Sequence, residues 1–229
     1  MKNLKNKIIS GLDEAGRGSI IGPLVVSCVV ADNHTIKQFS RIGVKDSKKL
    51  SSKKREIFAK IILKNAEKVY IRKISIRKID KAVNLRRDYI LKKIIPKTYD
   101  IVGLNELEAR SMASIINKLN TKIVYVDSCD VNPNRFKKRI LNQINNKISI
   151  RAQHKADEIY VVVAAASIIA KYIRDKEIKK IETLYGNIGS GYPSDPTTRL
   201  FLRRWFLKNG EIPNYARKSW KTWIKLQQK

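Results

Sequence analysis

Acidic residues are scarce in this chain of 229 residues. It has 20 Asp and Glu against 49 Lys and Arg, a formal net charge of +29. Such an excess of positive charge is typical of proteins that bind a polyanion, most often nucleic acid. An anionic membrane surface is the competing partner. Because acids are few, those that end apolar segments need an individual explanation.

Long apolar runs and metal-binding cysteine patterns are also missing. No apolar run approaches the ~20 residues of a membrane-spanning helix, and Met1–Lys5 begins no long apolar signal segment. We therefore expect a cytoplasmic protein. The two cysteines, Cys28 and Cys129, lie far apart in or beside apolar strands, which indicates free buried thiols. Neither has the spacing of a zinc site, and only His34 and His154 could add imidazole.

The order of predicted elements is that of an α/β protein. Glycine and proline are sparse, 10 and 6 residues, and no internal repeat or low-complexity linker interrupts the chain. Apolar patterning predicts strands over 7–13, 23–31, 68–76, 122–127 and 147–152. Helical periodicity, with Ser51-Ser52 as a cap and Asn132-Pro133 as a helix start, predicts helices over 52–65, 106–119, 132–142 and 157–183.

The C-terminal part is predicted to be an appendage. Residues 185–196 form a turn-rich loop, and 197–229 form two helices separated by Pro213. We expect a core over 1–184 and a helical substrate-binding region over 185–229, packed on that core. The predicted order is three strands followed by alternating helices and strands. This is the order of a ribonuclease H-like fold. Its mixed five-stranded sheet, flanked by helices, places the first and fourth strands side by side.

Four acids stand where predicted strands end or a helix begins. Asp13 and Glu14 follow the apolar run 8–12, Asp127 ends the run 123–126, and Asp157 precedes an apolar helix. In the expected sheet, Asp13 and Asp127 meet at one end and Asp157 leans over them. Neighbouring strand residues point to opposite faces, so Asp13 and Glu14 can share a side only if the chain bends.

Four converging carboxylates in a basic cleft would hold two divalent cations against a phosphodiester. Without metal, their repulsion would raise some of their pKa values and couple them. Alternatively, the four acids are ordinary strand-end or helix-capping residues. This alternative is strongest for Asp157 when that residue is considered alone.

Several segments share the motifs of one family, in that family's order along the chain. They are Asp13–Gly18 (DEAGRG), Lys45–Leu50 (KDSKKL), Val126–Ser128 (VDS), His154–Glu158 (HKADE), Ala164–Lys171 (AAASIIAK), Gly189–Pro196 (GSGYPSDP) and Arg217–Thr222 (RKSWKT). Over about residues 8–223 the chain resembles type 2 ribonuclease H, the ribonuclease HII family, in its archaeal branch. Ser19, Cys129 and Val161 depart from it where the family has proline.

The resemblance implies catalytic and substrate-binding residues. It makes Asp13, Glu14, Asp127 and Asp157 the catalytic ligands of two Mg²⁺ or Mn²⁺ ions. It makes the backbone of Gly16, Arg17 and Gly18, together with Tyr192, the sensor of a ribonucleotide 2′-hydroxyl. It makes Lys45, Ser47 and Lys48 a phosphate-contacting loop.

Simpler roles are open for several of these residues. Arg17 alone would suit a surface ion pair, Tyr192 loop packing, and the lysines of 45–48 plain solvated charge. His154 suits a structural role as well as proton transfer or product release. Trp220 and Trp223, three residues apart, suggest packing more than base stacking. We expect the basic face around them in 217–229 to track a duplex backbone.

The expected activity is that of an endoribonuclease. The family hydrolyses the RNA strand of RNA/DNA hybrids and cuts 5′ of ribonucleotides embedded in duplex DNA, leaving 3′-hydroxyl and 5′-phosphate ends. We expect a monomer with no membrane partner. A sliding-clamp partner is not expected, because Leu226–Lys229 holds no aromatic pair.

Two alternatives belong to different classes. Ribonuclease HIII shares the fold but carries an additional N-terminal domain and lacks the arginine of Gly-Arg-Gly. A non-enzymatic, basic nucleic-acid-binding protein would have no need of the acidic quartet.

Overall fold

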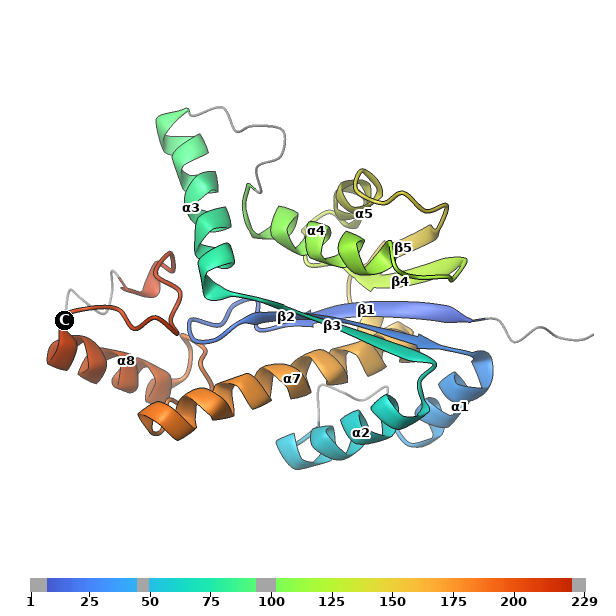
Figure 1. Cartoon of the computed structure of the whole chain (residues 1–229), viewed down its shortest axis with the longest axis horizontal. Helices are drawn as coiled ribbons and strands as arrows, with labels where there is room; N and C mark the ends of the chain where they lie inside the picture. The colour runs from blue at the N-terminus through green and yellow to red at the C-terminus, as the bar shows by residue number, and fades with distance from the viewer. Residues whose placement is uncertain (1–7, 45–49, 94–101, 224–229) are drawn as a thin grey trace, which may run out of the picture. The chain divides into compact units, whose positions relative to one another are not determined.

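A five-stranded mixed sheet is the framework of the fold (Figure 1). The computed structural model describes residues 8–44, 50–93 and 102–223. The strands are β1 Ile9–Ala15, β2 Leu24–Ala31, β3 Lys68–Ile74, β4 Ile123–Asp127 and β5 Ser149–Gln153. Their order is β3-β2-β1-β4-β5, with β1 antiparallel to β2 and parallel to β4, and β4 parallel to β5. The predicted fold, with β1 beside β4, is confirmed.

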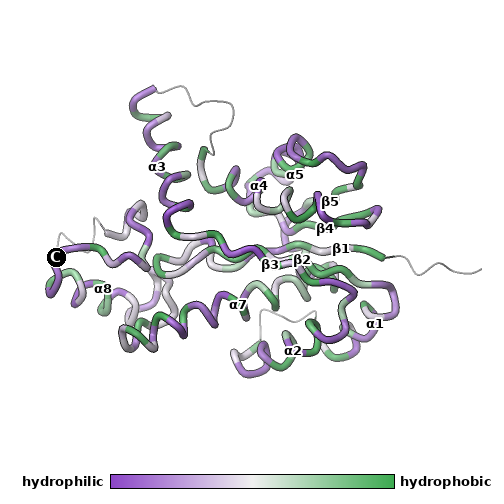
Figure 2. Tube along the Cα trace, viewed as in Figure 1, coloured by the Kyte–Doolittle hydropathy of each residue, from purple (hydrophilic) through white to green (hydrophobic). Residues whose placement is uncertain are grey.

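Eight helices accompany the sheet in the described part of the chain. They are α1 Asn33–Arg41, α2 Ser52–Asn65, α3 Ile76–Lys92, α4 Leu104–Ile116, α5 Pro133–Leu141, α6 Ala156–Ile159, α7 Val161–Tyr185 and α8 Pro196–Asn209. The predicted caps are present: the Ser51 hydroxyl accepts from the Lys54 amide, and Asn132 caps α5 ahead of Pro133. Neither α1 nor α3 was predicted from the sequence. Figure 2 shows α3 as largely hydrophilic, and only Ile79 and Ala82 of it are buried.

The chain divides into two compact units. The first comprises the residues up to Ala15, Val25–Arg72 and Glu108–Tyr172, and it contains nearly all of the sheet. The second comprises Gly16–Leu24, Lys73–Leu107 and the residues from Ile173 on. Each unit is therefore assembled from segments that are distant in sequence.

In the first unit, helices cover both faces of the sheet. Figure 1 shows α1, α2 and the start of α7 on one face and α4 with α5 on the other. The strand β2 is buried along its whole length, as expected of a strand covered on both sides. The sheet and α7 approach closely at Gly11. A Cβ on Gly11 would lie 2.5 Å from the Val162 carbonyl carbon and 2.6 Å from the Val163 nitrogen.

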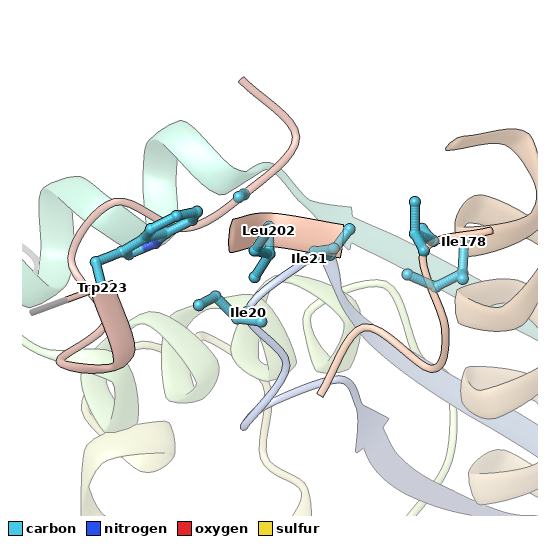
Figure 3. Close-up of a cluster of buried hydrophobic side chains, with 7 residues drawn as sticks. Ile20, Ile21, Ile178, Leu202 and Trp223 are labelled. Atoms are coloured by element: carbon cyan, nitrogen blue, oxygen red, sulfur yellow. The ribbon is translucent and has the colours of Figure 1, made fainter. Parts of the chain in front are cut away.

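In the second unit, a small apolar core joins Gly16–Leu24 to the segment that starts at Ile173 (Figure 3). Its buried members are Ile20, Ile21, Ile178, Ile188, Leu202, Ala216 and Trp223. Trp223 is 3% exposed and Trp220 packs beside this core, which confirms the packing role predicted for Trp223.

No described helix is long and apolar enough to cross a membrane.

Two predicted helices differ from the structure. The helix predicted over 157–183 is broken at Tyr160, which is extended and separates α6 from α7. The Tyr160 ring packs on Tyr125 of β4 at a centroid distance of 4.0 Å, and its hydroxyl bonds Gln153, so tertiary contacts outweigh the helical pattern here. Within the described residues, 210–221 form bends, turns and a bridge of Ala216 with Ile21 instead of helix. Thr222 and Trp223 are helical, and 224–229 lie outside the description.

Substituting Gly11 by alanine tests the contact between β1 and α7. The new methyl group would meet backbone atoms that cannot rotate away, so we expect a loss of roughly 3 kcal/mol or more in the free energy of unfolding. Gly18→Ala is the matched control, because a Cβ there meets nothing within 4 Å. Thermal or denaturant melts of both variants measure the difference. Equal stabilities would show that the helix can shift away from the strand.

Candidate active site

The parallel pairing of β1 and β4 brings two carboxylates to one end of the sheet. Leu12 pairs with Val126, so the next residues, Asp13 and Asp127, follow side by side at the ends of neighbouring strands. Asp13 is buried, with 4% exposure. The carboxyl ends of neighbouring parallel strands are a common place for ligand sites in α/β proteins.

The environment of Asp13 penalises its charge. Burial, followed by the negative charge of Asp127, raises the pKa of Asp13 to about 7. The Ser167 hydroxyl, the Glu14 amide, 2.7 Å from Asp13 Oδ1, and Lys171 act in the opposite direction. A buried acid beside a second acid is a poor place for two negative charges unless a cation joins them.

Asp157 lies in the short helix next to Asp127. The Ala156 amide donates to Asp127 Oδ1 at 2.7 Å, which fixes α6 against the end of β4. Lys155 adopts a left-handed conformation, φ +55°, to start this helix. Asp157 follows with 4% exposure. Three of the four predicted acids, Asp13, Asp127 and Asp157, therefore come from segments that are adjacent in space.

His154 lies just before these residues. Its Nδ1 lies 3.3 Å from the Ser128 carbonyl oxygen and its Nε2 lies 3.2 Å from that of Val131. These contacts join β5 to the loop after β4 and support a structural role.

Glu14 points to the opposite side of the sheet from Asp13. Asp13 interacts with Ser167 and Lys171 of α7, whereas Glu14 lies near Glu108 of α4. The two neighbouring side chains thus diverge, as the alternation of a strand requires. Ligand atoms of Glu14, Glu108 and Cys129 all lie within 4.8 Å of one another.

Glu108 and Cys129 were not predicted to be part of this region. Glu108 is fully buried, and the Cys129 thiol donates to its Oε2 at 3.0 Å. The sequence did hold one signal for Glu108: it is an acid within the mostly apolar helix 104–116, in a chain where acids are scarce. Both cysteines are free thiols; Cys28 is buried as predicted, whereas Cys129 is half-buried.

The donor set is suited to a hard divalent cation. Asp13, Asp127 and Asp157 offer carboxylate oxygens in a place where burial and the charge of Asp127 raise the pKa of Asp13, so that a cation would relieve both costs. Mg²⁺ and Mn²⁺ prefer such ligands.

The second unit contains the Gly-Arg-Gly loop. Gly16 has φ +84°, and a Cβ on it would lie 2.8 Å from the Pro23 carbonyl oxygen, so only glycine fits without strain. Gly18 is exposed and Arg17 half-buried, with Arg17 Nη2 donating to Asn105 Oδ1 at 2.6 Å. The loop is therefore a formed structure with a glycine backbone at the surface.

Tyr192 is held beside this loop within the second unit. The Gly191 carbonyl accepts from the amides of Ile20 and Ile21, at 2.8 and 3.1 Å, and from the Ser19 hydroxyl at 2.8 Å. The Arg174 guanidinium lies over the Tyr192 ring, 4.6 Å from its centroid. Ser19, a departure from the family pattern, thus joins the two loops through a hydrogen bond that proline could not make.

The remaining predicted residues divide into two cases. Lys45, Ser47 and Lys48 lie outside the described residues. Arg217, expected on a basic outer face, is fully buried; its side chain bonds backbone carbonyls, and that part of the prediction is wrong.

Comparison with known proteins now gives the family. A family model described as ribonuclease HII matches residues 10–223. The chain belongs to the ribonuclease HII family. The Ribonuclease HII of Thermococcus sibiricus is 42% identical over 223 residues, 96% of this chain and 92% of the relative.

Solved structures agree with this assignment. The ribonuclease H2 from Pyrococcus horikoshii superposes with a TM-score of 0.82 at 36% identity, over 96% of this chain and 97% of that one. The ribonuclease HII of Archaeoglobus fulgidus, solved as a complex with PCNA, gives 0.80 at 40% identity, over the same shares of 96% and 97%. Ribonuclease HII proteins are metal-dependent nucleases, so this chain is a ribonuclease H endonuclease rather than a non-enzymatic binder.

One expectation about partners is weakened by these relatives. We expected no sliding-clamp partner, yet the Archaeoglobus relative was solved bound to PCNA. The residues on which that expectation rested, 226–229, lie outside the described part of the chain.

Replacing Asp13 by asparagine should stabilise the metal-free protein. The folded-state pKa of Asp13, about 7, exceeds the ordinary 3.8, so folding favours its protonated form. This contribution is fully present below pH 3.8 and is lost as pH rises through 7, with a total on the order of a few kcal/mol. Asp13→Asn should therefore raise the melting temperature in EDTA more at pH 8 than at pH 5. A gain of equal size at both pH values would contradict the raised pKa of Asp13.

Proposed function

We propose that this ribonuclease HII cuts on the 5′ side of a ribonucleotide, in RNA/DNA hybrids and at single ribonucleotides embedded in duplex DNA. The products are a 3′-hydroxyl and a 5′-phosphate. The observation that carries the proposal is the juxtaposition of Asp13 and Asp127 at the ends of paired parallel strands, together with the raised pKa of Asp13.

The metal ligands proposed are Asp13, Glu14, Asp127 and Asp157. Because the Glu14 side chain leaves the opposite side of β1 from Asp13, Glu14 would join the other three through its backbone carbonyl or after the strand end bends. Two Mg²⁺ or Mn²⁺ ions bound there would activate a water molecule and stabilise the leaving oxygen. Asp13 and Asp127 are held rigidly, by the strand pairing and by the Ala156 amide on Asp127. Their positions are therefore set before any substrate arrives, which keeps the reorganisation needed for catalysis small.

The proposed sensor of the 2′-hydroxyl is the backbone of Gly16–Gly18 with Tyr192. The 2′-hydroxyl is the group that distinguishes RNA from DNA at such a site. The exposed backbone at Gly18 can approach a sugar closely, because no side chain intervenes. The Tyr192 ring, supported by Arg174, offers a face on which a neighbouring deoxyribose could stack. We further propose Lys45, Ser47 and Lys48 as backbone phosphate contacts.

A labelled DNA duplex with one ribonucleotide tests the reaction. The protein should make a single cut immediately 5′ of the ribonucleotide in Mg²⁺ or Mn²⁺ and none in EDTA. Asp13→Asn should lower the cleavage rate by roughly a thousand-fold or more while retaining duplex binding, because it removes a proposed metal ligand. Tight binding without cleavage by the native protein in either metal would refute the proposal.

Tyr192 gives a separate test of ribonucleotide sensing. Tyr192→Ala should reduce cleavage at a single embedded ribonucleotide by roughly ten-fold or more, because a stacking contact is worth about 1–3 kcal/mol. Tyr192→Phe, which keeps the ring and removes only the hydroxyl, is the control and should retain most activity. Steady-state rates and duplex affinities separate the two effects. Equal losses of cleavage and of binding to all-DNA duplex would mean that Tyr192 serves general binding instead.

A further inference from the structure

We propose that Arg217 is the residue that positions the Gly16–Arg17–Gly18 backbone for ribonucleotide recognition. The inference rests on the proposed function of that loop. It assigns a role to the C-terminal Arg-Lys-Ser-Trp segment that its basic character did not suggest. Arg217 would touch no substrate; it would act through the backbone that does.

Arg217 is an unusual residue for a protein interior. It is 0% exposed and heads the fully buried side chains of the described residues by volume. Burial lowers its pKa to about 9, which still leaves the guanidinium charged at neutral pH. A buried cation is costly unless strong hydrogen bonds compensate for its lost hydration. Such a residue is therefore retained where its hydrogen bonds have a use.

The compensation comes from the carbonyl groups of the loop itself. Arg217 Nη2 donates to the Gly16 carbonyl at 2.6 Å, and Nη1 donates to the Arg17 carbonyl at 2.7 Å. Nε and Nη2 both donate to the Gly22 carbonyl, at 3.2 and 3.1 Å. One planar fork thus holds three carbonyls, a geometry that the single ammonium of lysine cannot reproduce.

These bonds set the direction of the loop's peptide groups. In a planar trans peptide, the carbonyl and the following N–H point in opposite directions. Because the carbonyls of Gly16 and Arg17 point to the buried guanidinium, the amide hydrogens of Arg17 and Gly18 point away from it. Arg217 therefore determines which backbone groups the loop presents on its outer side.

The segment that carries Arg217 is itself firmly attached within the second unit. The Arg217 amide donates to the Ile20 carbonyl at 2.8 Å, and the Gly22 amide donates to the Tyr215 carbonyl at 3.0 Å. The Trp223 indole donates to the Arg217 carbonyl at 3.0 Å, and the Trp220 ring lies 4.8 Å from the guanidinium.

Asp80 holds the residues that follow. Its carboxylate accepts from the amides of Lys218 and Ser219, both at 3.0 Å. The attachment on both sides of Arg217 makes its guanidinium a fixed point to which the loop conforms.

The test compares recognition with general binding. In an Asp13→Asn background, which keeps substrate uncut, affinity is measured for duplex DNA with one ribonucleotide and for the same all-DNA duplex. Arg217→Lys, which keeps the charge, should lower the ratio of the two affinities by roughly ten-fold, through loss of the ribonucleotide preference. Binding to the all-DNA duplex should stay within about two-fold, since phosphate contacts depend on exposed charge. In the Asp13-containing enzyme, the same variant should lower kcat at the ribonucleotide.

Lys218→Ala is the matched control. It removes an exposed charge next to Arg217 and leaves the backbone bond to Asp80 available, so it should leave the affinity ratio unchanged. An unchanged ratio in Arg217→Lys, or equal weakening of both duplexes, would refute the positioning role. A native protein with no ribonucleotide preference would instead refute the proposed function, and the inference with it.

Asp80→Ala decides the matter if circular dichroism shows that Arg217→Lys does not fold. This variant keeps Arg217 but removes the carboxylate that holds residues 218 and 219. A lowered affinity ratio would support the inference, and a ratio equal to that of the native protein would overturn it.

Discussion

The parallel pairing of β1 with β4 is the constraint on which the candidate active site depends. It places Asp13 beside Asp127, although 113 residues separate them along the chain, and the backbone ladder rather than any side chain holds them there. Burial of Asp13, followed by the negative charge of the half-buried Asp127, raises the pKa of Asp13, so a charge at this position costs stability. The rest of the sheet must compensate for this cost. The complete burial of β2 and the close packing of Gly11 against α7 provide that stability. The middle of the sheet is well packed, and the unfavourable charges lie at its end.

Charge and shape have separate tasks in this molecule. The net charge of +29 attracts any nucleic acid and cannot by itself distinguish RNA from DNA. Discrimination needs groups at fixed positions, and in the sensor proposed for the second unit these are backbone groups held by buried arginines. Arg217 fixes the carbonyls of Gly16 and Arg17, while Arg174 supports Tyr192 and donates to the Ser19 hydroxyl. The same residue type therefore serves general attraction where it is exposed and precise placement where it is buried.

Much of the fold could be predicted because local signals and tertiary structure agree. The apolar runs that end in Asp13 and Asp127 are strands, and Ser51 and Asn132 cap helices as expected. The prediction failed where tertiary contacts decide. Tyr160 interrupts an otherwise helical run because its ring packs on Tyr125, and no local pattern reveals a partner 35 residues away. The Glu108–Cys129 contact was missed for the same reason.

Arg217 shows most clearly why sequence composition misleads about individual residues. It stands in a segment with four lysines and no acid, a pattern that favours a solvated basic face. The cause of its burial lies far away in the sequence. Three carbonyl groups of residues 16–22 need donors, and among side chains only a guanidinium can donate to all three together. Ser19 is a second example. Its hydroxyl donates a hydrogen bond to the Gly191 carbonyl, which fixes the loop where the family has the rigid proline ring. A loop built this way owes its shape to distant residues, so its recognition properties can change through substitutions that never touch a nucleic acid.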